Sequence, residues 1–133
     1  MSTRVIWAPY SSCATGMCMP LDHVALTVSD RERSAAFYGE HFGLTERVHD
    51  DEHLLILGDG EGSLLALWHG ELDATRLPRT NHFGFRLPHP DDVLAARERF
   101  RAAGVEEAEF QERGPTRVQV VDPDGYRVEV YAF

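Results

Sequence analysis

The 133-residue sequence predicts an α+β domain built from two similar halves, each a strand, a helix and three further strands. An apolar run beside a histidine opens each half, at His23 and at His82, which gives a repeat period close to 59 residues. A glycine then ends the helical stretch that follows, at Gly43 and at Gly104. Because only two copies occur, the pattern indicates a duplicated half-domain and not a solenoid array.

The first half is expected to begin with a strand at residues 23–28, where branched apolar side chains alternate with His23 and smaller residues. Ser29 and Glu32 have the spacing of a capping box and predict the start of a helix that ends at Gly43. Glycines separate the last two of the three strands that follow, which are expected at 45–48, 53–57 and 63–68.

The second half repeats this order after a linker at residues 69–80. Residues 82–87 predict a strand, Pro90 begins a helix and Gly104 ends it. Three strands are again expected, at 105–111, 116–121 and 126–132, with an Asp-Pro-Asp-Gly turn before the last. The sequence thus predicts one domain at residues 21–133, with module one at about 21–69 and module two at about 81–133.

The charge of the chain excludes one class of partner. The formal net charge is −9, and all 13 basic residues are arginine. An acidic chain without a basic run repels phosphate backbones, so we expect no nucleic-acid partner. We also expect no membrane partner, because no apolar stretch approaches the roughly 18 residues that span a bilayer.

Residues 1–20 form a tail of different composition. The tail lacks the charged start and the continuous apolar stretch of a signal peptide, which predicts a cytoplasmic protein. It contains either a short edge strand around Val5–Trp7 or no regular structure. Cys13 and Cys18 are too far apart for the common zinc or redox pairs, so we interpret them as incidental thiols.

Three side chains predict a metal site. Strand alternation places His23, His82 and Glu129 on the faces opposite the apolar residues of their strands. Two neutral imidazoles and one carboxylate suit a divalent transition metal (Fe, Mn, Ni or Zn) and leave coordination positions open for a substrate. Each residue also has a structural alternative, as a surface histidine or as the solvent-facing glutamate of an alternating strand.

The duplicated pattern resembles the vicinal oxygen chelate superfamily, which includes glyoxalase I, type I extradiol dioxygenases, fosfomycin-resistance enzymes and bleomycin-binding proteins. The resemblance covers residues 21–133 and is strongest at the closing Asp122-Pro123-Asp124-Gly125 and Glu129, and in the first helix with Phe37-Tyr38 and Phe42-Gly43-Leu44. It implies two βαβββ modules whose sheets curl into a cup-shaped, partly open barrel around a metal ion.

The resemblance also implies metal ligands on the first and last strand of each module. Three of these positions carry His23, His82 and Glu129, but the fourth is Ala66, which cannot bind a metal. Glyoxalase I uses a carboxylate there as ligand and base, so Ala66 argues against standard glyoxalase I action. A three-ligand site resembles the extradiol dioxygenases and fosfomycin enzymes, although Ala25 replaces a threonine that the fosfomycin group carries.

Strand alternation also gives candidates for substrate contact. The substrate-binding candidates are Thr27, Trp68, Arg86 and Arg117. An exposed tryptophan can stack on a flat ligand, and an arginine can bind a carboxylate. Tyr131 shares the face of Glu129 and is the candidate catalytic hydrogen-bond donor. Core or rim packing and a solvated surface are the structural alternatives for these residues.

The sequence leaves the function open between classes. The first is a small metal-dependent enzyme, a lyase or dioxygenase that acts on a substrate with vicinal oxygens. The second is a metal-free small-molecule binding or drug-sequestering protein of the bleomycin-resistance type, and the third is a regulatory or structural dimer. The resemblance implies a homodimer in any case, and if the modules pair between subunits, His23 joins His82 and Glu129 of the other subunit.

Overall fold

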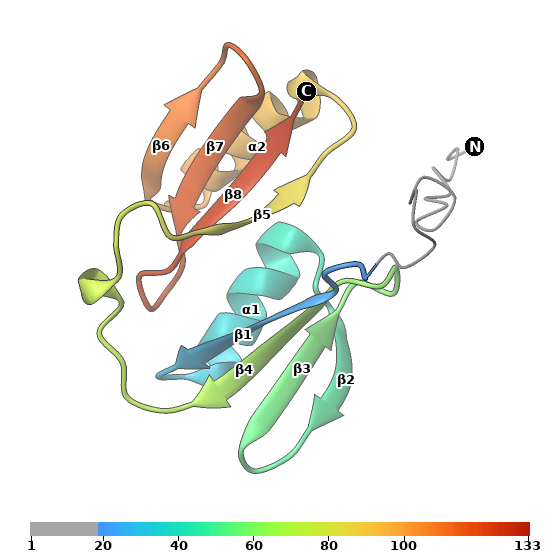
Figure 1. The fold of residues 1–133 in the computed structure, drawn as a ribbon, viewed down its shortest axis with the longest axis vertical. Coiled ribbons are helices and arrows are strands. Elements are labelled where there is room, and N and C mark those ends of the chain that lie inside the picture. Colours follow the sequence, from blue (N-terminus) through green and yellow to red (C-terminus); the bar gives the residue numbers. More distant parts are fainter. Residues whose placement is uncertain (1–18) are drawn as a thin grey trace.

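The computed structural model describes residues 19–133, which form two four-stranded sheets and two long helices (Figure 1). Module one consists of β1 (His23–Val28), α1 (Arg31–Phe42), β2 (Glu46–Asp50), β3 (Leu54–Gly58) and β4 (Leu64–His69). Module two consists of β5 (Phe83–Arg86), α2 (Pro90–Ala102), β6 (Glu107–Gln111), β7 (Thr116–Val121) and β8 (Arg127–Ala132). The proposed strand at Val5–Trp7 and both cysteines lie outside the described residues.

The two sheets have the same topology. Sheet one has the order β1-β4-β3-β2 and sheet two the order β5-β8-β7-β6, and in each the first strand runs parallel to the last. The linker between the modules contains one short 3₁₀ helix, η1 (Ala74–Arg76). The sheets do not close on each other (Figure 1). The predicted α+β fold of two βαβββ modules with open, cup-shaped sheets is therefore confirmed.

Strand alternation separates a buried face from an open face in each sheet. In β8, Val128, Val130 and Ala132 are buried, while Glu129 and Tyr131 point to the other side. Helix α2 packs against β7 and β8, and α1 packs against β4, so each helix covers the buried face of its own sheet. No helix among residues 19–133 is long and apolar enough to cross a membrane.

The start of α1 differs from the sequence prediction. Asp30, not Ser29, caps the helix, since its side chain accepts a hydrogen bond from the backbone N–H of Arg33 at 3.0 Å. The hydroxyl of Ser29 instead donates to the carboxylate of Asp124 at 2.5 Å. The capping-box spacing predicted that the Ser29 side chain would cap the helix. It binds Asp124 instead, which is 95 residues away in the sequence.

The two modules share one hydrophobic core. Helix α1 lies between the sheets, and its Phe42 ring stacks on Phe85 of β5 with ring centroids 4.8 Å apart. Tyr38 approaches Phe83 at 6.3 Å, and Phe100 of α2 packs against Phe42 at 5.6 Å. The buried side chains of both modules form a single cluster, so neither module is expected to fold independently of the other.

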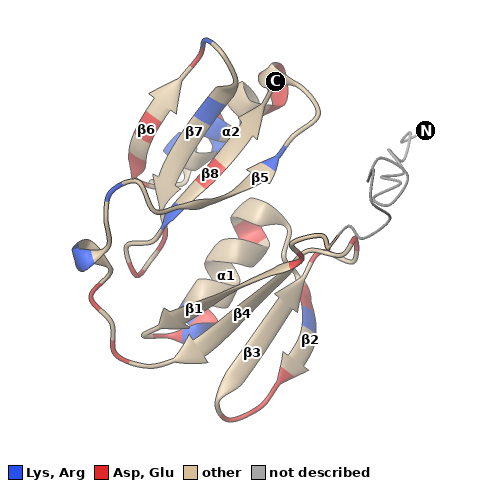
Figure 2. Ribbon diagram, viewed as in Figure 1, with Lys and Arg blue, Asp and Glu red and all other residues tan. Residues whose placement is uncertain are grey.

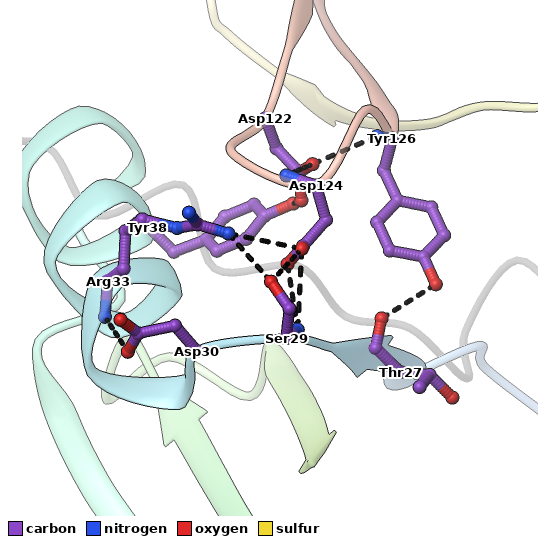
Figure 3. Close-up of polar contacts among 8 residues, drawn as sticks. All are labelled: Thr27, Ser29, Asp30, Arg33, Tyr38, Asp122, Asp124 and Tyr126. Carbon is purple, nitrogen blue, oxygen red and sulfur yellow. Dashed lines mark hydrogen bonds and ion pairs between the residues drawn. The ribbon is translucent and has the colours of Figure 1, made fainter. Parts of the chain in front are cut away.

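A polar network joins α1 to the turn between β7 and β8, and we call it the inter-module clamp (Figure 3). It comprises Ser29, Arg33, Tyr38, Asp122 and Asp124. The buried hydroxyl of Tyr38 donates to Asp122 at 2.6 Å, and Arg33 pairs with Asp124 at 3.2 Å. Burial raises the pKa of Tyr38 and also that of Asp122. The Asp-Pro-Asp-Gly turn is thus a structural anchor as well as a hairpin turn.

Candidate functional site

The open face of sheet one is apolar. Paired positions in neighbouring strands point to the same side, so β3 and β4 present a continuous set of apolar side chains there: Leu54, Ile56, Leu64, Ala66 and Trp68. Val48 of β2 adjoins this set beside Gly58. Trp68 and Val48 have exposed fractions of 46% and 51%. We call these six residues the apolar face.

The open face of sheet two is charged and hollowed. Figure 2 shows charged residues on all four of its strands, whereas β1, β3 and β4 carry none. A hollow of about 500 Å³ lies on this face, and we call it the polar hollow. Its lining comes from the linker and from β6, β7 and β8: Arg79, Thr80, His82, Glu109, Arg117, Gln119, Arg127 and Glu129. It contains two of the three predicted metal ligands.

His82 and Glu129 face each other in this hollow. His82 lies one residue before β5, and its Nδ1 is 2.8 Å from the carbonyl oxygen of Thr80. A carbonyl only accepts hydrogen bonds, so in a neutral imidazole Nδ1 carries the proton and Nε2 keeps a free lone pair. That Nε2 lies 3.7 Å from Oε2 of Glu129.

The second oxygen of Glu129 is held from the neighbouring strand. Oε1 accepts hydrogen bonds from Arg117 and from Gln119, both at 3.3 Å. Arg117 also donates to Glu109 at 2.5 Å, and this hydrogen bond is the main reason that the pKa of the guanidinium is raised. One carboxylate oxygen of Glu129 is therefore anchored, and the other points toward His82.

This pair fits a divalent metal ion. Two ligand atoms that share an ion at about 2.0–2.2 Å stand roughly 3–3.6 Å apart. The 3.7 Å between His82 and Glu129 is close to that separation, and it is too long for a hydrogen bond. The contact between His82 and the Thr80 carbonyl is the kind of support that orients ligating histidines in metal proteins.

His23 is not part of the same cluster. Its Nδ1 lies 2.7 Å from Asp22, and it lines a second hollow of about 530 Å³ between the modules, together with His82 and Arg86. Within residues 19–133 of one chain, no three His, Cys, Asp or Glu side chains lie close enough to hold a metal ion. One chain therefore supplies two of the three predicted ligands to a common point, and His23 remains at the edge of sheet one.

The predicted substrate-binding residues lie in three different places. Arg117 lines the polar hollow, whereas Thr27 and Trp68 lie opposite each other on β1 and β4 of sheet one. Arg86 lies over the ring of Phe133, which also contacts Tyr131 edge-on at 5.9 Å. Tyr131 is absent from the linings of both hollows.

Several residues of the polar hollow were missed by sequence reasoning. Gln119 pairs directly with Glu129 across β7 and β8. Predicting this contact would have required the register between the two strands. Gly84 pairs with Glu129 on the other side, where an added Cβ would lie 3.1 Å from the Glu129 Cβ. The absence of a side chain at position 84 leaves room beside Glu129, whose side chain is otherwise largely buried. Arg127 reaches the hollow from β8, and Arg79 reaches it because the linker passes beside sheet two.

Comparison with protein families gives one match. Residues 20–130 match the Glyoxalase/Bleomycin resistance protein/Dioxygenase superfamily, which is most of the chain. No curated protein shows a significant sequence match.

Similar solved structures agree with this match. A possible glyoxalase from Bacillus cereus is 26% identical, with a TM-score of 0.72 over 86% of this chain and 99% of its own. A lactoylglutathione lyase from Agrobacterium tumefaciens is 25% identical, with a TM-score of 0.67 over 85% and 92% of the two chains. The fosfomycin resistance protein FosX from Listeria monocytogenes has a TM-score of 0.73 over 88% and 95%, and at 23% identity it supports the fold alone.

Proposed function

Because the chain belongs to the Glyoxalase/Bleomycin resistance protein/Dioxygenase superfamily, we propose that it is a small metal-dependent enzyme. Its substrate would carry two neighbouring oxygens, and the reaction would be that of a lyase or a dioxygenase. The observation that carries this proposal is the geometry of His82 and Glu129, in which Nε2 of His82 lies 3.7 Å from Oε2 of Glu129 while Nδ1 contacts the Thr80 carbonyl.

We further propose that the third ligand is His23 of the other subunit in a homodimer. His23 stands at the edge of sheet one, beside the apolar face, in which the side chains of Trp68 and Val48 are exposed. In this arrangement the apolar face of one subunit packs over the polar hollow of the other, with two consequences. The apolar face is removed from water, and the hollow receives a second imidazole.

The bound ion would be Fe, Mn, Ni or Zn, since all four accept two imidazoles and a carboxylate. A mutant of FosX from Listeria monocytogenes was crystallised with Mn(II) and 1S,2S-dihydroxypropylphosphonic acid, which makes manganese a natural first choice. When bound, such an ion supplies Lewis-acid polarisation of a substrate oxygen.

Residues of the chain would orient the metal ligands and exclude water. The Thr80 carbonyl fixes the tautomer of His82, and Arg117 with Gln119 keeps Glu129 in one orientation. The apolar face would exclude water from the closed cup. Ala66 can neither bind a metal nor accept a proton, so we do not assign the proton transfer of standard glyoxalase I to this position.

Elemental analysis of protein purified without added metal tests the proposal. We expect close to one ion per chain in the wild type and a near-complete loss in Glu129→Gln. The matched control is Glu98→Gln, which makes the same change on the exposed side of α2 and should keep its metal. Equal and negligible metal in all three proteins would rule out the metal-dependent enzyme.

One observation favours a second candidate, a metal-free protein that binds or sequesters a small molecule. Arg117 already neutralises Glu129, and the indole of Trp68 is available to stack on a planar compound. In this case ligand binding would survive both chelator treatment and His82→Ala. Loss of binding under either condition would exclude this candidate.

A further inference from the structure

The polar hollow is locally cationic in an acidic protein. Three arginines and two glutamates line it, which leaves an excess of one positive charge when His82 is neutral. The whole chain carries a formal net charge of −9. An arginine-rich concave site on an otherwise anionic molecule attracts small anions and concentrates them at that place.

The three arginines are not equivalent. Arg117 is held by Glu109 and Glu129, and its charge is therefore balanced. Arg79 and Arg127 form no ion pair or side-chain hydrogen bond with any residue of the 19–133 segment. Two guanidinium groups that line one hollow without a carboxylate partner among the described residues leave room for an added anion.

The position of Arg127 relates this charge to the metal ligands. Arg127 lies two residues before Glu129 on β8, on the same face, which corresponds to roughly 6–7 Å along the strand. Gln119 opposes Glu129 and is the diagonal neighbour of Arg127. An anionic group on Arg127 would thus lie a few bonds away from oxygens held between His82 and Glu129.

We propose that the polar hollow binds the oxyanion end of a small substrate, a carboxylate, phosphate or phosphonate, through Arg127 and Arg79. The forked guanidinium group matches the geometry of these anions and donates two parallel hydrogen bonds to them. The hollow of about 500 Å³ has the size of a small-molecule site. The identification of this anion as part of the substrate rests on the proposed function, whereas its binding to the arginines does not require a metal.

Titration of the full-length, metal-free protein with inorganic phosphate tests the proposal. Binding would be followed by NMR at constant ionic strength, through backbone amide and arginine Nε signals. We expect saturable shifts in the wild type, with a Kd at least fivefold higher in Arg127→Gln and at least threefold higher in Arg79→Gln. Arg99→Gln removes the same charge from the exposed side of α2 and should bind within twofold of the wild type.

Acetate, titrated in the same way, identifies the anion. Tighter binding of acetate assigns a carboxylate to the substrate, and tighter binding of phosphate assigns a tetrahedral oxyanion. Binding of neither overturns the proposal, and so does an equal Kd in Arg127→Gln and Arg99→Gln.

Glu129→Gln separates this proposal from that of the metal-dependent enzyme. This variant should lose metal and yet bind phosphate at least as tightly as the wild type, because a negative charge leaves the hollow. If the wild type binds phosphate but contains no metal in the elemental analysis described above, the anion site stands and the metal site is refuted. If the wild type contains metal but the metal-free protein does not bind phosphate, the anion site alone is refuted.

Discussion

The two modules have the same strand order and the same register, yet their open faces are opposite in character. Ala25 pairs with Ala66 across β1 and β4, and Gly84 pairs with Glu129 at the equivalent position across β5 and β8. The first pair leaves a flat apolar surface, whereas the second leaves a carboxylate uncovered by any side chain at position 84. One βαβββ backbone therefore carries either an apolar open face or a charged one.

This difference teaches where function is encoded in a duplicated fold. The buried faces of both sheets obey the same rule, with branched apolar residues in the core. Selection for packing explains those positions in both modules. The open faces are free of that constraint, so a few residues at one register position make one face apolar and the other charged.

The largest expected effect comes from placing a charge on the apolar face. Ile56→Arg should weaken the proposed homodimer by at least 100-fold, about 3 kcal/mol, because an unpaired guanidinium would be buried against the partner. Ala95→Arg, on the exposed side of α2, is the control and should leave the dimer intact. Sedimentation at several concentrations gives the dissociation constants, and equal values in both variants would mean that this face is not the interface.

Mutations at the polar contacts between the modules test whether the two modules unfold as one unit. Tyr38→Phe leaves the buried Asp122 without its hydroxyl donor and should lower the free energy of unfolding by about 1–3 kcal/mol. Tyr126→Phe removes a partly buried hydrogen bond to the Thr27 carbonyl and should lower it by about 0.5–1.5 kcal/mol. Urea unfolding should remain a single transition in both. Two separate transitions in the wild type would show that the modules are independent.

A carboxylate on the open face of sheet one would make this face more similar to the charged open face of sheet two. Ala66→Glu places a fourth ligand at the position equivalent to Glu129, and we expect metal affinity to rise about tenfold, or 1.4 kcal/mol. Ala66→Gln is the uncharged control of similar size. Metal affinity measured by competition with a chelating dye distinguishes them. No gain over the control would place sheet one outside the metal site.

The smallest expected effect concerns pH. Burial raises the pKa of Asp122 in the folded state, so the folded protein holds this proton more readily than the unfolded chain. Its contribution to stability is therefore greatest below the ordinary pKa of 3.8 and is lost as pH rises through the folded-state pKa. Asp122→Asn cannot titrate, so its stability relative to the wild type should increase with pH over this window. Urea unfolding across the range from pH 4 upward measures this, and a constant difference would contradict it.

Local rules of the sequence predicted most of the fold. Alternation identified the buried and open faces of β8, and the glycines at 43 and 104 marked the helix ends, because these signals depend on neighbouring residues only. The capping role of Ser29 was predicted wrongly, since its true partner, Asp124, is distant in the sequence. Arg79 was missed for the same reason, because no local pattern reveals that the linker passes beside sheet two. Alternation did place Arg127 on the face of Glu129, but no role was assigned to it.

The candidate site was predicted only in part. His82 and Glu129 share a surface because β5 and β8 are paired neighbours in one sheet, which the duplicated pattern already implied. The position of His23 relative to them depends on how α1 and the clamp orient one module against the other. That orientation results from long-range packing, which neither hydrophobic periodicity nor residue spacing encodes.

The clamp also has a consequence for the order of events during synthesis. Its two sides are separated by 84 residues at Tyr38 and Asp122 and by 95 at Ser29 and Asp124. Module one therefore leaves the ribosome long before the turn that secures its helix has been made. Until β5 and α2 emerge, the Phe42 ring on the inter-module surface of α1 has no partner from module two. Module two completes the core around α1, so ribosome-bound chains that stop before β5 should bind chaperones that recognise exposed apolar segments.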